Sequence, residues 1–400
     1  MSTEGTLPPA LKRMTMPALA AGAILIAISA AALAIDSATF FRAYLVGYLW
    51  VLGLTLGSMG LLFLHHLVGG AWGFIIQRQL EAATRVYPVL VVLFLPILWN
   101  VVASGHPIYH WAEDGAYTHD ALLAHKAPYL NKAAFTLRAV IYFVVWGVLI
   151  FNLNRWSKKQ QESGDGTISN KLRTLGGPGI VLYMFTMTFA AFDWAMSLDP
   201  HWFSTIYGAI FVVGQVLTTQ AFMVLFASRA RANEEVAHAI TMDRYHDLTK
   251  LMFAFTCLWA YVSLSQFLIY WYGNLPEEVI FFHLRFQGGW EYVTLLVVFG
   301  QFVIPFFLLL SRWPKRSFVW APRIAAFIIV IRAVDLFWYV VPHPEAGTKI
   351  ESQLHLSWVH FTAPLGMFAL WLGFFLMSYA KRSVLPSKDP RWKEIVSHAH

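Results

Sequence analysis

The sequence predicts an all-α integral membrane protein with about ten transmembrane helices. Only 13% of its 400 residues are charged, whereas soluble domains carry about 25%. Hydrophobic residues make up 58%, and the 17 Trp and 16 Tyr favour a bilayer, because amphipathic rings collect at the membrane–water interface. A chain with so few charges cannot cover a water-facing surface, so most of its surface must face lipid.

Ten segments, taken in order, reach or nearly reach the roughly 20 apolar residues that cross the hydrocarbon layer. The first follows Lys12 and Arg13 as a signal peptide would, but its length favours a retained helix. The third is short and holds Pro88 and Pro96, which membrane helices tolerate. We treat residues 1–400 as one polytopic domain. The expected spans are 17–35, 43–68, 86–103, 133–152, 178–197, 202–227, 250–272, 290–311, 320–341 and 355–379.

Most of the 29 Lys and Arg residues lie in alternate connections. Lys and Arg are retained on the cytoplasmic side, so this bias predicts an even number of spans with both termini cytoplasmic. The net charge of +7 therefore indicates basic loops and no nucleic acid partner. Among these connections, 153–177 is polar and is predicted to be a flexible, solvated linker.

The connections on the other face are 104–132, 273–289 and 342–354. The first is long and holds His106, His110, His119 and His125. We interpret it as a contact surface for a partner, and the histidine spacing does not favour a metal site.

A short pattern recurs after 142 residues. Asp193 is followed seven residues later by Pro200-His201, and Asp335 by Pro342-His343. The two acids lie four spans apart, and membrane proteins are often built from repeated helix sets. We therefore expect a four-helix bundle at 43–197, a second at 202–341, and peripheral first and last spans.

Two groups of charged residues lie within the expected spans, where a charge is expensive unless it is paired or hydrated. Arg138 and Asp193 both fall in the outer half of the membrane and can pair. Glu291, Arg332 and Asp335 form the second group, with the last two on one helix face. The first group is interpreted either as a structural ion pair or as a proton relay or quinol-facing group. The second is interpreted either as a satisfied polar network or as part of a proton pathway.

Weaker candidates for that pathway are His65 and His66, near the inner end of the second span, and Gln215 in the sixth. Adjacent histidines point about 100° apart on a helix, and His360 lies in the opposite half of the membrane, so haem ligation is not expected. Cys257 is the only cysteine. The chain therefore has no internal disulfide, no cluster bound by several cysteines and no C-x-x-C-H haem attachment.

The most distinctive segment is 192–208, Phe-Asp-Trp-Ala-Met-Ser-Leu-Asp-Pro-His-Trp-Phe-Ser-Thr-Ile-Tyr-Gly. It resembles the D-W-x-x-S-x-x-P-x-W-x-S-T-x-(Y/F)-G stretch of the two large membrane subunits of alternative complex III. Those subunits are similar to the NrfD/PsrC-like family of polysulfide reductase membrane subunits. The chain's length resembles that of the smaller subunit, F.

The resemblance implies a membrane subunit of a quinol:electron-acceptor oxidoreductase in the bacterial cytoplasmic membrane. It implies a proton pathway, with Asp193 at the motif's acid, and a contact with quinol or menaquinol whose residues are not identified. The chain would hold no redox centre. Haem c and iron–sulfur clusters would lie in partners, namely multihaem cytochrome c subunits and an iron–sulfur subunit, beside a second NrfD-like subunit and membrane lipids.

Two other functions fit the residues. A secondary transporter could use the buried charges to bind an ion or a solute. Alternatively, the chain could be a structural anchor for haem and iron–sulfur subunits, with its ion pairs serving only to hold helices together.

Overall fold

The computed structural model describes residues 8–342 and 353–392, and within these ranges the chain is helical, without strands. Nine stretches of the described chain are long and apolar enough to cross a membrane, which confirms a multi-pass helical membrane protein. They are Pro9–Ala34, Ser37–Val68, Gln77–Val102, Lys132–Ser163, Thr167–Leu198, Tyr207–Ala230, Met242–Gly273, Trp290–Leu310 and Val359–Tyr379.

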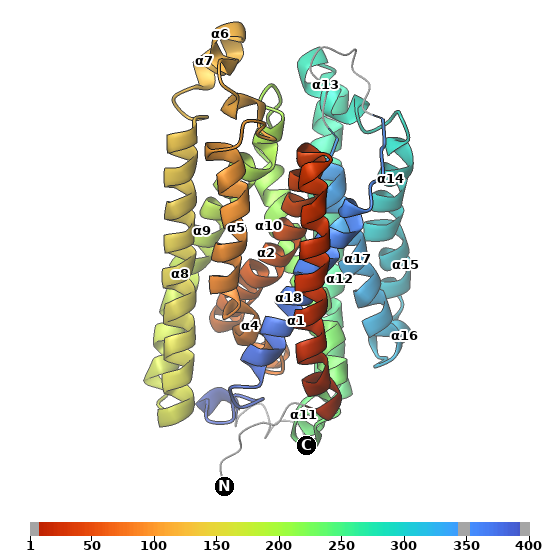
Figure 1. Cartoon of the computed structure of the whole chain (residues 1–400). Coiled ribbons are helices and arrows are strands. Elements are labelled where there is room, and N and C mark those ends of the chain that lie inside the picture. The colour runs from red at the N-terminus through yellow and green to blue at the C-terminus, as the bar shows by residue number, and fades with distance from the viewer. Residues whose placement is uncertain (1–7, 343–352, 393–400) are drawn as a thin grey trace.

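Helices make up most of the described chain (Figure 1). Their bounds are α1 Pro9–Ala30, α2 Ser37–Val68, α3 Ala71–Phe74, α4 Gln77–Thr84, α5 Tyr87–Val102, α6 Ala116–His119, α7 Ala121–Lys126, α8 Lys132–Ser163, α9 Thr167–Trp194, α10 Tyr207–Ala230, α11 Glu234–Ala239, α12 Met242–Gly273, α13 Pro276–His283, α14 Trp290–Val297, α15 Ile304–Leu310, α16 Arg312–Lys315, α17 Trp320–Val340 and α18 Val359–Tyr379. A π-helical turn, η4 (Val298–Val303), joins α14 to α15.

The remaining expected span corresponds to α17, which has 21 residues. It lies against α10, α2 and α14. It is not one of the nine apolar stretches given above. The reason is its composition, because Arg323, Arg332 and Asp335 reduce its apolar character. A helix of this length is about 30 Å long, enough to reach across the hydrocarbon layer.

The helix contacts close into two rings. In the first, α2 contacts α5 and α9, and α8 contacts the same two helices. In the second, α10 contacts α12 and α17, while the chain from α14 to α15 contacts both of these helices. The rings meet where α2 packs along α10. The division of the chain into two bundles stays a prediction, and this arrangement is compatible with it.

The first and last spans pack together, with α18 between α1 and α2. Glycines allow the backbones to approach. A Cβ at Gly22 would overlap Leu370, and one at Gly373 would overlap Leu19. Small residues at such crossings are typical of helix packing in membranes.

The described chain begins and ends at the same end of the molecule, the lower end in Figure 1. The elements at this end are α4, α11, α16 and the turn between α8 and α9. They lie in the connections that are rich in Lys and Arg, so we call this the basic end. The opposite end, called the loop end, carries α6, α7 and α13.

The prediction of a flexible linker at 153–177 was wrong. Helix α8 continues to Ser163 and α9 begins at Thr167, so only a short turn separates them. The run from Arg155 to Glu162 is rich in Lys, Gln and Glu, which are good helix formers. Gly164 ends the helix with a φ of 68°, a conformation that glycine adopts without strain.

Candidate functional site

Arg138 on α8 and Asp193 on α9 form a bidentate ion pair near the loop end. Arg138 Nε lies 2.8 Å from Asp193 Oδ2 and Nη2 lies 2.9 Å from Oδ1. The Tyr142 hydroxyl also donates to Oδ2, at 2.8 Å. Asp193 is fully buried, so these bonds satisfy both oxygens of an ionised carboxylate. The structure thus brings together the first predicted pair.

A cleft of about 380 Å³ lies beside this pair, between α7, the end of α9 and residues 199–203. Phe189, Phe192 and Phe203 form much of its wall, and its lining is largely apolar. Tyr129 lines the cleft and also packs its ring under the Arg138 guanidinium, 3.8 Å from the ring centre. Its volume falls within the range of small-molecule sites.

Polar groups gather at the loop-end side of the cleft. His201 Nε2 lies 2.6 Å from Asp120 Oδ2, and Lys126 Nζ donates to the Pro200 carbonyl at 2.6 Å. Burial lowers the pKa of Lys126 from its usual value, although the carboxylates of Asp199 and Asp120 act in the opposite direction. An apolar cleft with a His–Asp pair at one side suits a ring that carries a hydroxyl group.

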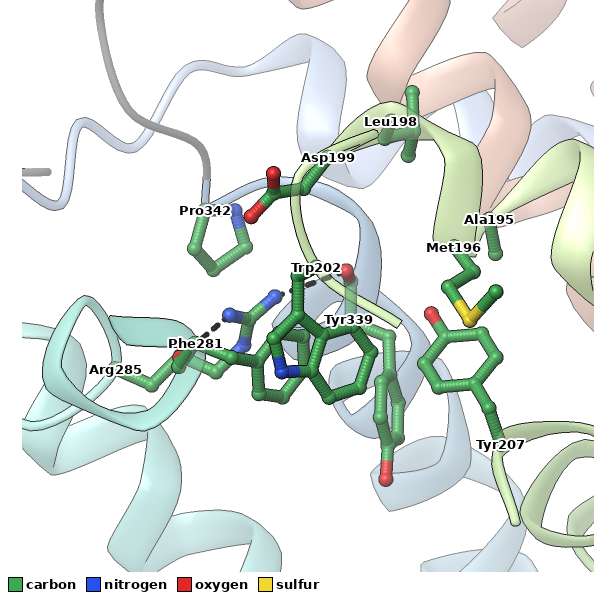
Figure 2. A pocket seen from close by; sticks show the side chains of 10 residues that line it. All are labelled: Ala195, Met196, Leu198, Asp199, Trp202, Tyr207, Phe281, Arg285, Tyr339 and Pro342. Atoms are coloured by element: carbon green, nitrogen blue, oxygen red, sulfur yellow. Dashed lines mark hydrogen bonds between the residues drawn. The ribbon is translucent and has the colours of Figure 1, made fainter. Parts of the chain in front are cut away.

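The segment 192–208 also lines a smaller cavity of about 10 Å³ (Figure 2). Met196, Asp199 and Trp202 line both the cleft and this cavity. Trp202 stacks on Phe281, with ring centres 4.0 Å apart. Its ring centre also lies 5.6 Å from that of Tyr270 on α12, so the distinctive segment, which begins on α9 of the first ring, contacts the second ring as well.

Arg285 closes the smaller cavity from the opposite side. Its guanidinium donates to the carbonyls of Phe281, Trp338 and Tyr339 at 2.8–3.1 Å. Figure 2 shows two of these bonds, with Asp199 across the cavity. Burial lowers the pKa of Arg285 to about 10, so the side chain stays charged at neutral pH. It supplies positive charge to the C-terminal carbonyls of α17.

The second ion pair lies inside the second ring. Arg332 and Asp335 are one turn apart on α17, both are buried, and Arg332 Nη1 donates to Asp335 Oδ2. The Arg332 guanidinium lies against Gly214 of α10. Asp335 Oδ1 makes no hydrogen bond of normal geometry with a described residue, although the Trp259 indole lies beside the carboxylate. The two predicted pairs therefore differ, because only Asp193 has both oxygens satisfied.

Other polar atoms without partners are buried in the helices of the second ring. In the described chain, Ser263 Oγ and Gln266 Nε2 on α12, and both side-chain polar atoms of Gln301 on η4, have no hydrogen bond. Ser263 and Gln266 lie one and two turns beyond Trp259 on one face of α12. Gln301 lies in a π-helical turn, a feature frequent at functional sites. Buried polar groups of this kind are normally satisfied by internal water.

Two other predicted residues lie apart from these pairs. Glu291 is in the first turn of α14, where its Oε2 accepts from the Gly289 amide at 2.8 Å. Arg332 pairs with Asp335 and not with Glu291 in the described structure. Gln215 lies where α2, α9 and α10 meet, and its Oε1 accepts from the Tyr183 hydroxyl at 2.8 Å.

His65 and His66 are buried at the basic end of α2. The His65 ring packs edge-on against Phe74, with ring centres 4.5 Å apart. His66 lies within range of the charges of Glu81, Arg78 and Arg391. Both histidines therefore lie far from the two ion pairs, beside a third group of charges.

This third group of charges centres on Glu81 of α4, and the sequence did not lead us to predict it. Arg78 Nη1 and Ser157 Oγ donate to its carboxylate at 2.7 and 2.5 Å, and Arg382 and Arg85 lie at 3.7 and 4.0 Å. All eight residues of α4 are buried. One feature of the sequence could have indicated it. Glu81 is an acid in a basic connection, three residues after Arg78 and four before Arg85, so on a helix it lies beside both.

The connection 104–132 folds onto the loop end. Tyr109 donates to the Trp194 carbonyl at 2.9 Å, and His110 pairs with the nearby Glu113 at 3.0 Å. Across residues 8–342 and 353–392, no group of three or more His, Cys, Asp or Glu side chains could hold a metal ion. His343, the last residue of the repeated Asp…Pro-His pattern, lies outside the described residues.

No protein-family model matches the sequence, and a comparison with curated proteins gives no match.

Proposed function

We propose that the chain is a membrane subunit of a quinol:electron-acceptor oxidoreductase of the alternative complex III type, in the bacterial cytoplasmic membrane. In this proposal α17 also crosses the membrane and completes the set of ten spans as the ninth along the chain, the basic end faces the cytoplasm, and the two rings are the two four-helix bundles. The chain contributes a proton pathway and a contact with quinol. Electrons pass to haem c and iron–sulfur clusters in partner subunits, beside a second NrfD-like subunit.

The observation that carries the proposal is the position of segment 192–208, on which the family resemblance rests. This one segment supplies Asp193 to the first ion pair, His201 to the polar side of the cleft and Trp202 to the lining of both cavities. A long motif that only linked two spans would not need to line both cavities. Its residues therefore suit a site better than a connection.

The proton pathway in this proposal runs through the second ring. Asp335 has an oxygen that can take a proton, and Gln266 and Gln301 can hold the water that delivers it. In this proposal Asp193, whose two oxygens accept hydrogen bonds from Arg138 and Tyr142, orders the wall of the cleft. The group at Glu81, with His66 nearby, would serve proton uptake at the basic end.

Quinol contact is assigned to the cleft. Oxidation of a quinol to a quinone releases two protons and two electrons. The His201–Asp120 pair lies where it can accept a ring hydroxyl proton at the loop end, and the electrons would leave for a partner subunit. The phenylalanine walls suit the ring and the start of the isoprenoid tail.

A second candidate function is a proton-coupled transporter, favoured by the unsatisfied polar atoms around Asp335. It would require no partner chains. Purification from native membranes in mild detergent, with mass spectrometry of co-purifying chains and a haem spectrum, separates the two functions. A multihaem cytochrome and an iron–sulfur protein should co-purify, and a haem-free, solitary chain would refute the oxidoreductase proposal.

The proton role is tested with Asp335→Asn in the purified assembly. We expect unchanged subunit composition, with quinol turnover or proton release reduced at least about tenfold, because one general acid–base group contributes on the order of 100-fold or more. Glu162→Gln on the exposed surface is the control. Normal turnover and proton yield in Asp335→Asn would exclude Asp335 from the pathway.

A further inference from the structure

The turn between α15 and α17 at the basic end exposes two large aromatic side chains. Trp313 and Trp320 are 64% and 43% exposed. Their rings lie 5.7 Å apart, and the Arg323 guanidinium lies 5.0 Å from the centre of the Trp320 ring. Arg312 precedes Trp313 and is also exposed. The turn thus holds two neighbouring tryptophan rings tilted by 48° to each other, with Arg323 near the Trp320 ring and Arg312 next to Trp313 in the sequence.

The same turn has an excess of positive charge. The carboxylates of Asp243 and Asp247 pair with Arg316 and Lys250, both at 2.6 Å. Within the described chain, neither Arg312 nor Arg323 has an ion pair with an acid. Lys315 adds a further cation, 5.1 Å from the Phe253 ring centre. Like charges gathered without acids repel one another, so a bound anion would stabilise this turn.

The turn is also fixed in place. Thr249 donates to the Lys315 carbonyl at 2.9 Å, and Pro314 is buried. Ser311 caps α16. Because the backbone is held against α12, the arginines and tryptophans project from a preformed support.

Apolar side chains continue from this turn along the two helices that flank it. Phe307 and Leu310 on α15 and Val330 on α17 are exposed by 57–67%. These surfaces suit acyl chains, and tryptophan rings favour the headgroup level of a bilayer. Arginine binds phosphate oxygens through two parallel hydrogen bonds. Basic pockets between membrane helices on the cytoplasmic side bind anionic lipid headgroups.

We propose that Arg312, Trp313, Trp320 and Arg323 form a binding site for the phosphate of an anionic phospholipid, such as phosphatidylglycerol. The headgroup phosphate lies between the two arginines, the tryptophan rings lie at the level of the ester groups, and the acyl chains follow α15 and α17. The site is separate from the ion pairs and the cleft, and it does not depend on the quinol proposal.

The test uses the full-length protein with its co-purifying chains, in neutral detergent, titrated with phosphatidylglycerol and followed by native mass spectrometry. Arg312→Gln with Arg323→Gln should weaken binding roughly 30-fold, because each cation near the surface contributes about one factor of five. The matched control is Arg155→Gln with Arg173→Gln. These arginines are exposed at the same end, and their loss should change binding less than about twofold.

A second variant, Trp313→Leu with Trp320→Leu, keeps every charge and should still weaken binding several-fold. An equal loss in the control pair would show a diffuse charge effect and overturn the proposal. Equal binding of phosphatidylcholine would overturn it as well. If inorganic phosphate competed with a dissociation constant equal to that of the lipid, the site would be a simple phosphate site, and the lipid proposal would be rejected.

Discussion

Arg138 and Asp193 meet across α8 and α9 in a bidentate ion pair, although 55 residues separate them in the chain. The Arg138 side chain also donates to the Tyr129 carbonyl and covers the Tyr129 ring. Since Tyr129 lines the cleft, the pair fixes the wall of the cleft as well as the contact between the two helices.

A double-mutant cycle on this pair tests its structural role. Asp193→Asn leaves the Arg138 charge without its partner and should reduce the free energy of unfolding by about 2 kcal/mol. Arg138→Gln with Asp193→Asn removes both charges and should recover most of that loss. Thermal unfolding of the purified protein measures both effects. Equal losses in the single and double variants would show that the charges do not compensate each other.

The Arg332 position depends on a glycine. A Cβ at Gly214 would overlap the Arg332 guanidinium, so Gly214→Ala should displace Arg332 from Asp335 and reduce stability by about 1–3 kcal/mol. Gly177→Ala is the matched control, because its Cβ meets nothing within 4 Å. The control should be neutral or stabilising by about 0.5–1 kcal/mol. Indistinguishable unfolding temperatures for the two variants would contradict the packing argument.

The buried charges around Glu81 predict that two acids at the basic end, Glu81 and Glu162, differ strongly in their contribution to stability. Glu81→Gln removes the carboxylate that Arg78, Arg85 and Arg382 surround and should cost about 3–5 kcal/mol. Glu162→Gln removes the exposed partner of Lys158 and should cost less than about 0.5 kcal/mol. Expression level and thermal unfolding compare the two. A mild effect of Glu81→Gln would mean that water already compensates the arginines.

The cleft should loosen in acid. The Leu123 amide, followed by the His201 side chain, holds the pKa of Asp120 below its usual value. A group whose pKa is lowered on folding stabilises the fold above its unfolded pKa, near 3.9, and this contribution is lost as the pH falls through the folded value. Hydrogen exchange at residues 120–126 should therefore increase as the pH falls below about 4, after correction for the intrinsic rate.

Asp120→Asn provides the control for that experiment. Asparagine can still cap α7 but has no charge to lose, so its exchange should depend less on pH across this range. Matching pH profiles for the two proteins would assign the loosening to other groups.

The amino-acid sequence was enough to predict the membrane class and most of the spans, because hydropathy depends on local composition. It also predicted that Arg138 can reach Asp193, since consecutive helices place them at one depth. From its hydropathy, α4 was predicted to be part of a basic loop. A buried helix of polar residues at the membrane edge has the same composition as a solvent-exposed connection. The burial of α4 depends on Ser157 and Arg382, which come from distant parts of the chain.

Which polar groups meet depends on the packing of the helices in three dimensions. The rotation of α17 about its axis aims Arg332 at Gly214 and leaves Asp335 Oδ1 beside the Trp259 indole, without a hydrogen bond of normal geometry from any described residue. Helix α14 keeps Glu291 at its own first turn, away from that pair. The contact of Trp313 with Trp320, and of Trp320 with Arg323, likewise depends on how α15 and α17 are joined. Hydropathy fixes where a helix crosses the membrane, but its rotation is set by packing against neighbours that are distant in the sequence.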